Sequence, residues 1–477
     1  MCFKRLLARL PGRQLIGARA RHRSGAIAVV GVVVVALAGP QPAGAQTFLE
    51  ALTTTYVNNP TLRAARAELR AVDESVAQAL SNWRPEISVD GFGGAQYTDT
   101  QSDFFSDKGG SQPRGGELNV VQPLYRGGRT QSATNAAEAE VLSQRARLKS
   151  VEQDILFDAT VSYVDVWRDQ SVLELNINNE QVLQRNLEAS RDRFEVGEIT
   201  RTDVAQSESR LARATADRIA ADGNLNSSRA VFQRVVGDYP GQLTQPDPAA
   251  GLPKQLEELT AISLDNDPEV IASEFAENAA RANVRTILGE LLPSARLRGS
   301  LRYDDDQGIS STERQQAEII AEVTIPLYQQ GAASSRVRQA RQIAMQRRIE
   351  VDEARSQARQ DSIVAWEVLV TNRAQIESFR SEVATAEIAL EGVRQENEVG
   401  ERTVLDVLDA EQELLDAQVR LATARRDELV ASYAMLRAMG RFTAEDLGLD
   451  VDLYDPAANY RDVRDKWFGL EIDDSAQ

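Results

Sequence analysis

The segment Val196-Gly-Glu-Ile-Thr-Arg-Thr-Asp203 recurs in altered form as Val399-Gly-Glu-Arg-Thr-Val-Leu-Asp406. The two segments are 203 positions apart, and the same spacing separates Gly237 from Gly440. This period is far longer than the roughly 20–50 residues of solenoid repeats. The pattern therefore predicts an internal duplication, in which two copies of one large unit follow each other along the chain.

Upstream of these segments the two copies stay in register, with a small difference in spacing. The matched proline-containing positions are Pro60 with Pro268, Pro85 with Pro293, and Gln122-Pro-Leu-Tyr125 with Ile325-Pro-Leu-Tyr328. The first two pairs are 208 positions apart and the third is 203 apart, so the copies differ in length between the second and third pairs. We divide the chain into a first repeat, residues 46–263, a second repeat, residues 264–440, and a C-terminal segment, residues 441–477.

Each repeat is predicted to run helix, strand, strand, long helix, helix. The first helix is expected over 47–82 and over 264–291, because a proline follows each. Alternating apolar and polar residues predict strands at about 86–98, 116–125, 294–303 and 315–327. Alternation over ~10 residues is typical of a transmembrane β-barrel strand, but a half-buried hairpin of a soluble protein has the same period. The connecting residues 99–115 and 304–314 are expected to form polar loops.

The longest predicted helices, residues 129–194 and 332–397, contain no proline. A continuous helix of this length would extend ~100 Å at ~1.5 Å per residue, which is longer than a compact domain uses. Heptad spacing in the second copy indicates coiled-coil packing through Ile376, Phe379, Val383, Ala386, Leu390 and Val393. We therefore expect a mainly α protein with a small β part, for which a coiled-coil scaffold is one possible role.

The N-terminus has the organisation of an export signal. Residues 1–24 carry seven Lys and Arg residues and no acid, and an apolar run follows over 26–38. Ala43-Gly44-Ala45 then supplies the small residues of a cleavage site, so residues 1–45 are predicted to be a signal peptide. A membrane anchor is the alternative, but the apolar run is shorter than the ~20 residues that span a bilayer.

Composition excludes several kinds of chemistry. Cys2 and His22 are the only Cys and His residues, and both lie in the predicted signal peptide. Their loss excludes Cys nucleophiles, Ser-His-Asp triads, zinc sites with Cys or His, and disulfides. The net charge of −18 argues against a nucleic-acid partner. Paired carboxylates can serve a hydrolase, but here they lie on predicted solvated helices, so we expect no enzyme activity, metal or cofactor.

If the four predicted strands cross a membrane, one chain cannot close a barrel with them. The smallest membrane barrels have about eight strands, and open strand edges are not tolerated in lipid. A membrane protein with this sequence therefore needs several chains that pool their strands.

Several segments of this sequence form a specific combination. They are the Asn-x-Pro segments at Asn58 and Asn266, the two Pro-Leu-Tyr strand ends, the two Val-Gly-Glu turns, Tyr454-Asp-Pro-Ala-Ala-Asn-Tyr460, and Lys466-Trp-Phe-Gly469. Together they resemble the TolC family of outer-membrane efflux and secretion channels, over essentially all of residues 46–470. The resemblance implies four transmembrane strands per chain and a homotrimer, with a twelve-stranded barrel in outer-membrane lipid and a helical tunnel through the periplasm of a Gram-negative bacterium. Residues 240–263 and 441–470 would form an equatorial collar, followed by a tail.

The function that the resemblance implies is a passive exit duct for tripartite efflux pumps, type I protein secretion, or both. Its implied partners are a periplasmic adaptor (membrane fusion) protein and an inner-membrane pump of RND or ABC type. The alternative is a periplasmic coiled-coil scaffold or adaptor without a membrane barrel. The transported substrates and the identity of the pump do not follow from the sequence.

Asp406 and Asp409 are the candidate residues of the channel entrance. They are three positions apart near the start of a predicted helix and therefore share a face. The resemblance places them at the entrance constriction, where a trimer would gather six carboxylates and focus a negative potential. For Asp406 there is a structural alternative, because Thr403-x-x-Asp406 is a capping-box pattern. The copy-one counterpart of Asp409 is Gln206, which carries no charge.

The resemblance also assigns roles in the two Val-Gly-Glu turns. Arg402 would bridge to Thr202 and Asp203 and hold a closed entrance, while a simple solvated turn is the alternative. A tyrosine usual in the family is replaced by Asn397, which leaves open whether the bridging network is intact. Gly197 and Gly400 would mark the helix tips that contact the adaptor.

Overall fold

The computed structural model describes residues 47–102, 105–306 and 313–471. The predicted signal peptide, residues 1–45, lies outside the described residues. In the described ranges, no helix combines the length and the apolar character needed to cross a membrane.

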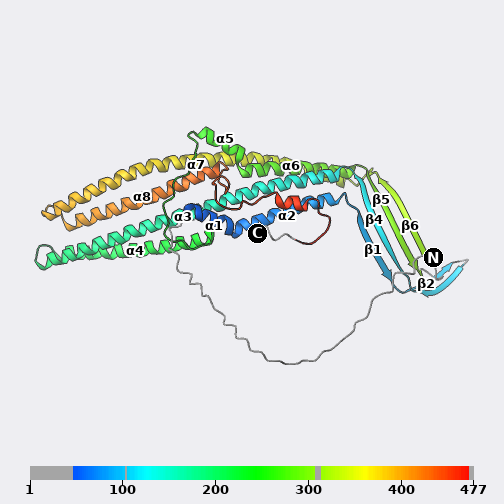
Figure 1. Cartoon of the computed structure of the whole chain (residues 1–477), viewed down its shortest axis with the longest axis horizontal. Coiled ribbons are helices and arrows are strands. Elements are labelled where there is room, and N and C mark those ends of the chain that lie inside the picture. The colour runs from blue at the N-terminus through cyan, green and yellow to red at the C-terminus, as the bar shows by residue number, and fades with distance from the viewer. Residues whose placement is uncertain (1–46, 103–104, 307–312, 472–477) are drawn as a thin grey trace, which may run out of the picture. The chain divides into compact units, whose positions relative to one another are not determined.

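In the part of the chain that the structure describes, the two repeats contain equivalent helices in the same order (Figure 1). In the first repeat they are α1 (Phe48–Asn58), α2 (Pro60–Ser81), α3 (Arg129–Glu195) and α4 (Arg201–Val236). In the second they are α5 (Leu256–Asn266), which begins before the boundary at residue 264 expected from the sequence, α6 (Pro268–Leu288), α7 (Ala332–Glu398) and α8 (Val404–Ala438), and α9 (Ala458–Val463) follows. The two predicted long helices are confirmed as α3 and α7, each 67 residues long.

The prediction of one continuous first helix in each repeat was wrong, because the helix is interrupted at the residue before a proline. The Asn59 side chain accepts hydrogen bonds from the N–H groups of Thr61 and Leu62, which caps α2 at its first residue, Pro60. Asp267 caps α6 before Pro268 in the same way. Proline has no N–H to continue the preceding helix but suits the first helical position, so both copies contain two helices where one was predicted.

Four strands form one antiparallel sheet in the order β1-β4-β5-β6. They are β1 (Glu86–Gly93), β4 (Arg114–Arg126), β5 (Ser294–Asp305) and β6 (Arg314–Thr324). The central β4–β5 pair joins the two repeats, and β1 and β6 lie at the two ends of the sheet in the described part of the chain.

The register separates the two faces of this sheet by chemical character. Val89, Leu118, Leu301 and Ala317 are aligned across the four strands on one face. The adjacent row on the other face is Asp90, Glu117, Arg302 and Gln316. We call the first of these the apolar face. Because its side chains are largely exposed in the single chain, this face has no partner within the described residues.

A second, two-stranded sheet occupies part of the predicted loop 99–115. It consists of β2 (Gln96–Ser102) and β3 (Phe105–Ser111), which pair with each other and not with the main sheet. The prediction of a plain loop was therefore wrong. A hairpin of this kind is held by backbone hydrogen bonds, so its polar, Gly-rich sequence carried no apolar alternation by which it could be recognised.

The long helices form two hairpins, α3 with α4 and α7 with α8 (Figure 1). The α3 helix also packs against α2, α6 and α8, so it connects the two repeats along its length. An aromatic cluster lies where α1, α3, α8 and the C-terminal segment meet. In it Phe48 contacts Tyr163 and Tyr433 with ring centroids 5.4 and 5.0 Å apart, and Tyr433 lies 5.7 Å from Phe442. This cluster fixes the C-terminal segment against the first repeat.

Candidate functional site

The two hairpin tips end their first helix with the same backbone motif. Gly197 and Gly400 adopt left-handed φ angles of 81° and 82°, a conformation that costs residues with a Cβ about 1–2 kcal/mol. The next N–H groups, of Glu198 and Glu401, donate to the carbonyls of Arg193 and Glu396, both at 2.9 Å. These are the bonds of a Schellman motif, which gives both copies the same tight turn.

The second helix of each hairpin begins with a capping box. The N–H of Thr403 donates to the Asp406 carboxylate at 2.9 Å, and the N–H of Asp406 donates to the Thr403 hydroxyl at 3.3 Å. Thr200 and Asp203 have the same arrangement in copy one. The hydrogen bond from the Thr403 N–H holds the pKa of Asp406 below its usual range. The capping role considered for Asp406 is thus present, and the carboxylate remains charged while it fills that role.

Asp409 forms an ion pair with Arg210, which belongs to α4 of the other hairpin. The neighbouring residue Leu408 is buried and packs with Leu183 of α3 and Ala214 of α4. Asp409 therefore lies where the two hairpins touch, with about half of its side chain exposed. Sequence reasoning missed Arg210, because no local pattern links two residues on different repeats.

The predicted bridging residues have other partners within the single chain. The Arg402 guanidinium donates to the carboxylate of Glu396 at 2.9 Å, within its own turn. Asn397 donates to the Arg402 carbonyl at 2.8 Å, so the asparagine at the usual tyrosine position supports this turn. Thr202 is exposed at the start of α4. A bridge from Arg402 to Thr202 and Asp203 stays a prediction.

A further pair of interactions follows the duplication. Arg394 pairs with Glu411 in copy two, and Arg191 pairs with Glu208 at the equivalent positions in copy one. The Glu411 side chain is only 8% exposed, whereas the Glu208 side chain is 51% exposed. Each hairpin therefore has an equivalent ion pair between its two helices. The carboxylate of this pair is buried in copy two and exposed to water in copy one.

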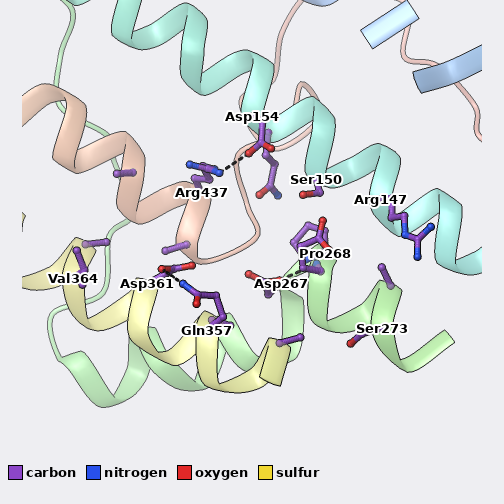
Figure 2. A pocket seen from close by; sticks show the side chains of 18 of the residues that line it. Arg147, Ser150, Asp154, Asp267, Pro268, Ser273, Gln357, Asp361, Val364 and Arg437 are labelled. Carbon is purple, nitrogen blue, oxygen red and sulfur yellow. Dashed lines mark hydrogen bonds and ion pairs between the residues drawn. The ribbon is translucent and has the colours of Figure 1, made fainter. Parts of the chain in front are cut away.

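A cavity of about 960 Å³ lies where α8 ends and α6 begins, between α3 and α7 (Figure 2). Asp154 of α3 pairs with Arg437 at 2.6 Å, and Gln357 donates to Asp361 at 2.8 Å. Asp267 is occupied in capping α6. Burial raises the pKa of both Asp154 and Asp267. The Asp154–Arg437 pair connects the end of α8 to α3, whereas the other two interactions stabilise α7 and α6 individually.

Within the described ranges, no group of three or more His, Cys, Asp or Glu side chains is arranged to hold a metal ion. At the tips, Asp203 and Asp406 are instead used in caps, and Asp409 is used in an ion pair.

The profile of the family described as "Outer membrane efflux protein" matches residues 52–238 and 259–441, one match for each repeat. The outer membrane efflux protein BepC of Brucella suis biovar 1 (strain 1330) is 38% identical over 91% of this chain and 94% of its own length. The proteases secretion protein PrtF of Dickeya chrysanthemi is 24% identical over 88% of this chain and 93% of its own. The Campylobacter jejuni CmeC outer membrane channel has the same fold, with a TM-score of 0.75, 14% identity, and 87% and 89% of the two chains covered.

The chain therefore belongs to the outer membrane efflux protein family, and the resemblance to the TolC family is confirmed. This family consists of outer-membrane channels for efflux and secretion and is not a family of enzymes. The predicted fold class, channel function and outer-membrane location are confirmed with it, in preference to a periplasmic scaffold.

The duplicated ion pairs allow one test of how the tips are held. We expect Glu411→Gln to destabilise the protein by about 1–3 kcal/mol, because the Arg394 guanidinium loses its charged acceptor at a buried site and keeps only a neutral amide oxygen. Glu208→Gln is the matched control and should cost about 0.2–1 kcal/mol, since its pair is exposed. Thermal unfolding of the detergent-solubilised variants, followed by circular dichroism, measures both. Equal losses for the two variants would contradict the assignment of Glu411 as the buried member.

Proposed function

We propose that three copies of the chain assemble into one passive exit duct across the outer membrane and the periplasm. The observation that carries this proposal is the main sheet, which has one apolar face and ends at β1 and β6. In lipid, the outer edges of β1 and β6 need hydrogen-bond partners. Pairing β6 of one copy with β1 of the next supplies them, and three copies close a barrel of about twelve strands.

The helical part of the proposed trimer continues the duct. Three copies of the α3–α4 and α7–α8 hairpins, extended by α2 and α6, would form the wall of a periplasmic tunnel. Residues 240–263 and 441–470 would surround it as a collar, as expected from the buried contacts of Phe442 and Leu243 with the helices. Transport would be driven by partners, and the duct itself would perform no catalysis and hold no cofactor.

The proposed duct could serve either efflux or type I secretion as the exit route. BepC is named for efflux and PrtF for the secretion of proteases, and the chain covers most of both. We propose that a periplasmic adaptor protein contacts the hairpin tips at Gly197 and Gly400, where short turns leave the backbone exposed. An inner-membrane pump of RND or ABC type would deliver the substrate.

The assembly is tested by extracting the protein from membranes and measuring its mass and its conductance. We expect extraction only with detergent, a trimeric mass by sedimentation, and stable single channels in planar bilayers. These follow because the apolar face requires lipid and the strand edges require neighbouring copies. A buffer-soluble monomer without conductance would refute the duct and favour a periplasmic scaffold.

At the periplasmic end, we propose that Asp406 and Asp409 of three chains form an acidic ring around a constriction. The support is that Asp406 stays ionised in its capping box and that Asp409 is half-exposed beside it, one turn further along α8. Arg210 offsets part of the charge of Asp409, so Asp406 would supply most of the negative potential.

Replacement of both carboxylates tests the ring. Asp406→Ala with Asp409→Ala should weaken the block of conductance by a trivalent cation, because the focused negative potential is lost. The matched control is Gln206→Ala, which changes the copy-one position equivalent to Asp409 and leaves Asp203 in place. Block that is unchanged in the first variant, or weakened equally in both, would exclude a specific ring.

We further propose that Arg402 holds the entrance closed by bridging to Thr202 and Asp203 in the assembled trimer. Arg402→Ser should then raise single-channel conductance. Glu396→Gln is the control, because it removes only the partner that Arg402 has within its own turn. A conductance equal to that of the unmodified protein, or the same increase with Glu396→Gln, would remove the bridging role.

A further inference from the structure

The chain beyond α9 exposes large apolar side chains in close succession. Residues 466–470, Lys-Trp-Phe-Gly-Leu, follow a short turn after Val463, and we call them the aromatic tail. Trp467 is 64% exposed, Phe468 is 89% exposed and Leu470 is fully exposed. Exposed apolar residues that stand singly need no explanation, but a group of this kind indicates a contact surface. Neither the capping motifs nor the helix packing described above uses it.

Two contacts fix the aromatic tail at the boundary between helices and sheet. The Arg84 guanidinium lies over the Trp467 ring, 4.9 Å from its centroid, and also donates to the Lys466 carbonyl at 2.6 Å. Arg84 lies in the short connection between the end of α2 and the start of β1. Upstream, Asn459 of α9 donates to Asp73 of α2 at 2.8 Å. The aromatic tail is thus held beside α2 and reaches the first residues of the sheet.

The same boundary carries exposed apolar residues at every connection between a helix and the main sheet. By the strand register, the start of β1, the end of β4, the start of β5 and the end of β6 all lie at one end of the sheet. The exposed apolar residues in these connections or at the adjoining end of β4 are Trp83, Leu124, Tyr125, Leu291, Leu292, Ile325, Leu327 and Tyr328. The aromatic tail adds to this group at the connection between α2 and β1, through its contacts with Arg84.

We propose that the aromatic tail is a lipid anchor, which inserts into the interfacial region of the periplasmic leaflet of the outer membrane. This inference rests on the proposed function, because it requires the apolar face of the sheet to lie in lipid. Trp and Tyr concentrate at membrane–water boundaries, where the ring body contacts acyl chains and the polar edge stays hydrated. Arg84 and Lys466 place two cations at the level of the phospholipid phosphates, and Phe468 and Leu470 supply the apolar contact.

The anchor accounts for why the last residues of the proposed collar, 466–470, extend to Arg84 in the connection between α2 and β1. Without lipid, three large apolar side chains would remain in water beside an already exposed sheet edge. With lipid, the aromatic tail is fixed to the membrane at one end of the sheet, while Phe442 and α9 fix the C-terminal segment to the helices. The phospholipid leaflet is therefore the occupant we assign to this surface, rather than a second copy of the chain.

The test uses single-cysteine labelling of the full-length protein, since the only Cys in the sequence is Cys2 in the predicted signal peptide. Phe468→Cys carries an environment-sensitive fluorophore, and the protein is reconstituted into phosphatidylethanolamine–phosphatidylglycerol vesicles. Some of the lipids carry a nitroxide quencher close to the headgroup. We expect the emission at position 468 to be quenched. Tyr239→Cys, at an exposed site on the loop after α4, should keep its emission.

Val89→Cys, on the apolar face of β1, separates failure of the anchor from failure of the proposed function. Quenching at position 89 without quenching at position 468 would overturn the anchor and leave the membrane duct intact. Absence of quenching at both positions would overturn both. If the label at position 468 is unquenched and cross-links to a neighbouring copy, the aromatic tail is a contact between copies and the lipid assignment is wrong.

Discussion

The backbone N–H and C=O groups along the outer edges of β1 and β6 set the main constraint on this protein. Within the chain, the β4–β5 pair makes one sheet from the two repeats, but the sheet still ends on both sides. Lipid offers no hydrogen-bond partners, and this is the reason why the proposed duct pairs the two edges with further copies. In that proposed assembly, the number of copies that closes the sheet also determines how many hairpins surround the tunnel, because the long helices follow the strands in the chain.

The duplication gives the chain two hairpin tips with one backbone design and different side chains. Both tips use a glycine with positive φ, a Schellman motif and a Thr–Asp capping box. The differences lie one turn further along the second helix, where copy two has Asp409 and a buried Glu411. The equivalent caps give both tips the same turn. Asp409, where copy one has Gln206, makes the copy-two tip more acidic, and the buried Glu411 connects α8 to α7 through Arg394.

Most helices were predictable because their signals are local. Proline-free stretches gave α3 and α7 to within one residue, and the capping box at Asp406 was visible as Thr-x-x-Asp. The breaks at Asn59-Pro60 and Asp267-Pro268 carried an equally local signal that the periodicity of the flanking residues obscured. The β2–β3 hairpin had no such signal, because backbone pairing between polar residues leaves no trace in hydropathy.

The sequence by itself determined where helices begin and end and which face of each strand is apolar, since caps, prolines and alternation act over a few neighbouring residues. The tertiary structure decided which charges meet. Asp409 reaches Arg210, Arg84 covers Trp467, and Arg402 turns to Glu396, and the first two of these contacts join residues that lie far apart in the chain. Side-chain partners across repeats depend on how helices pack in three dimensions, and packing is a property of the whole chain rather than of any segment.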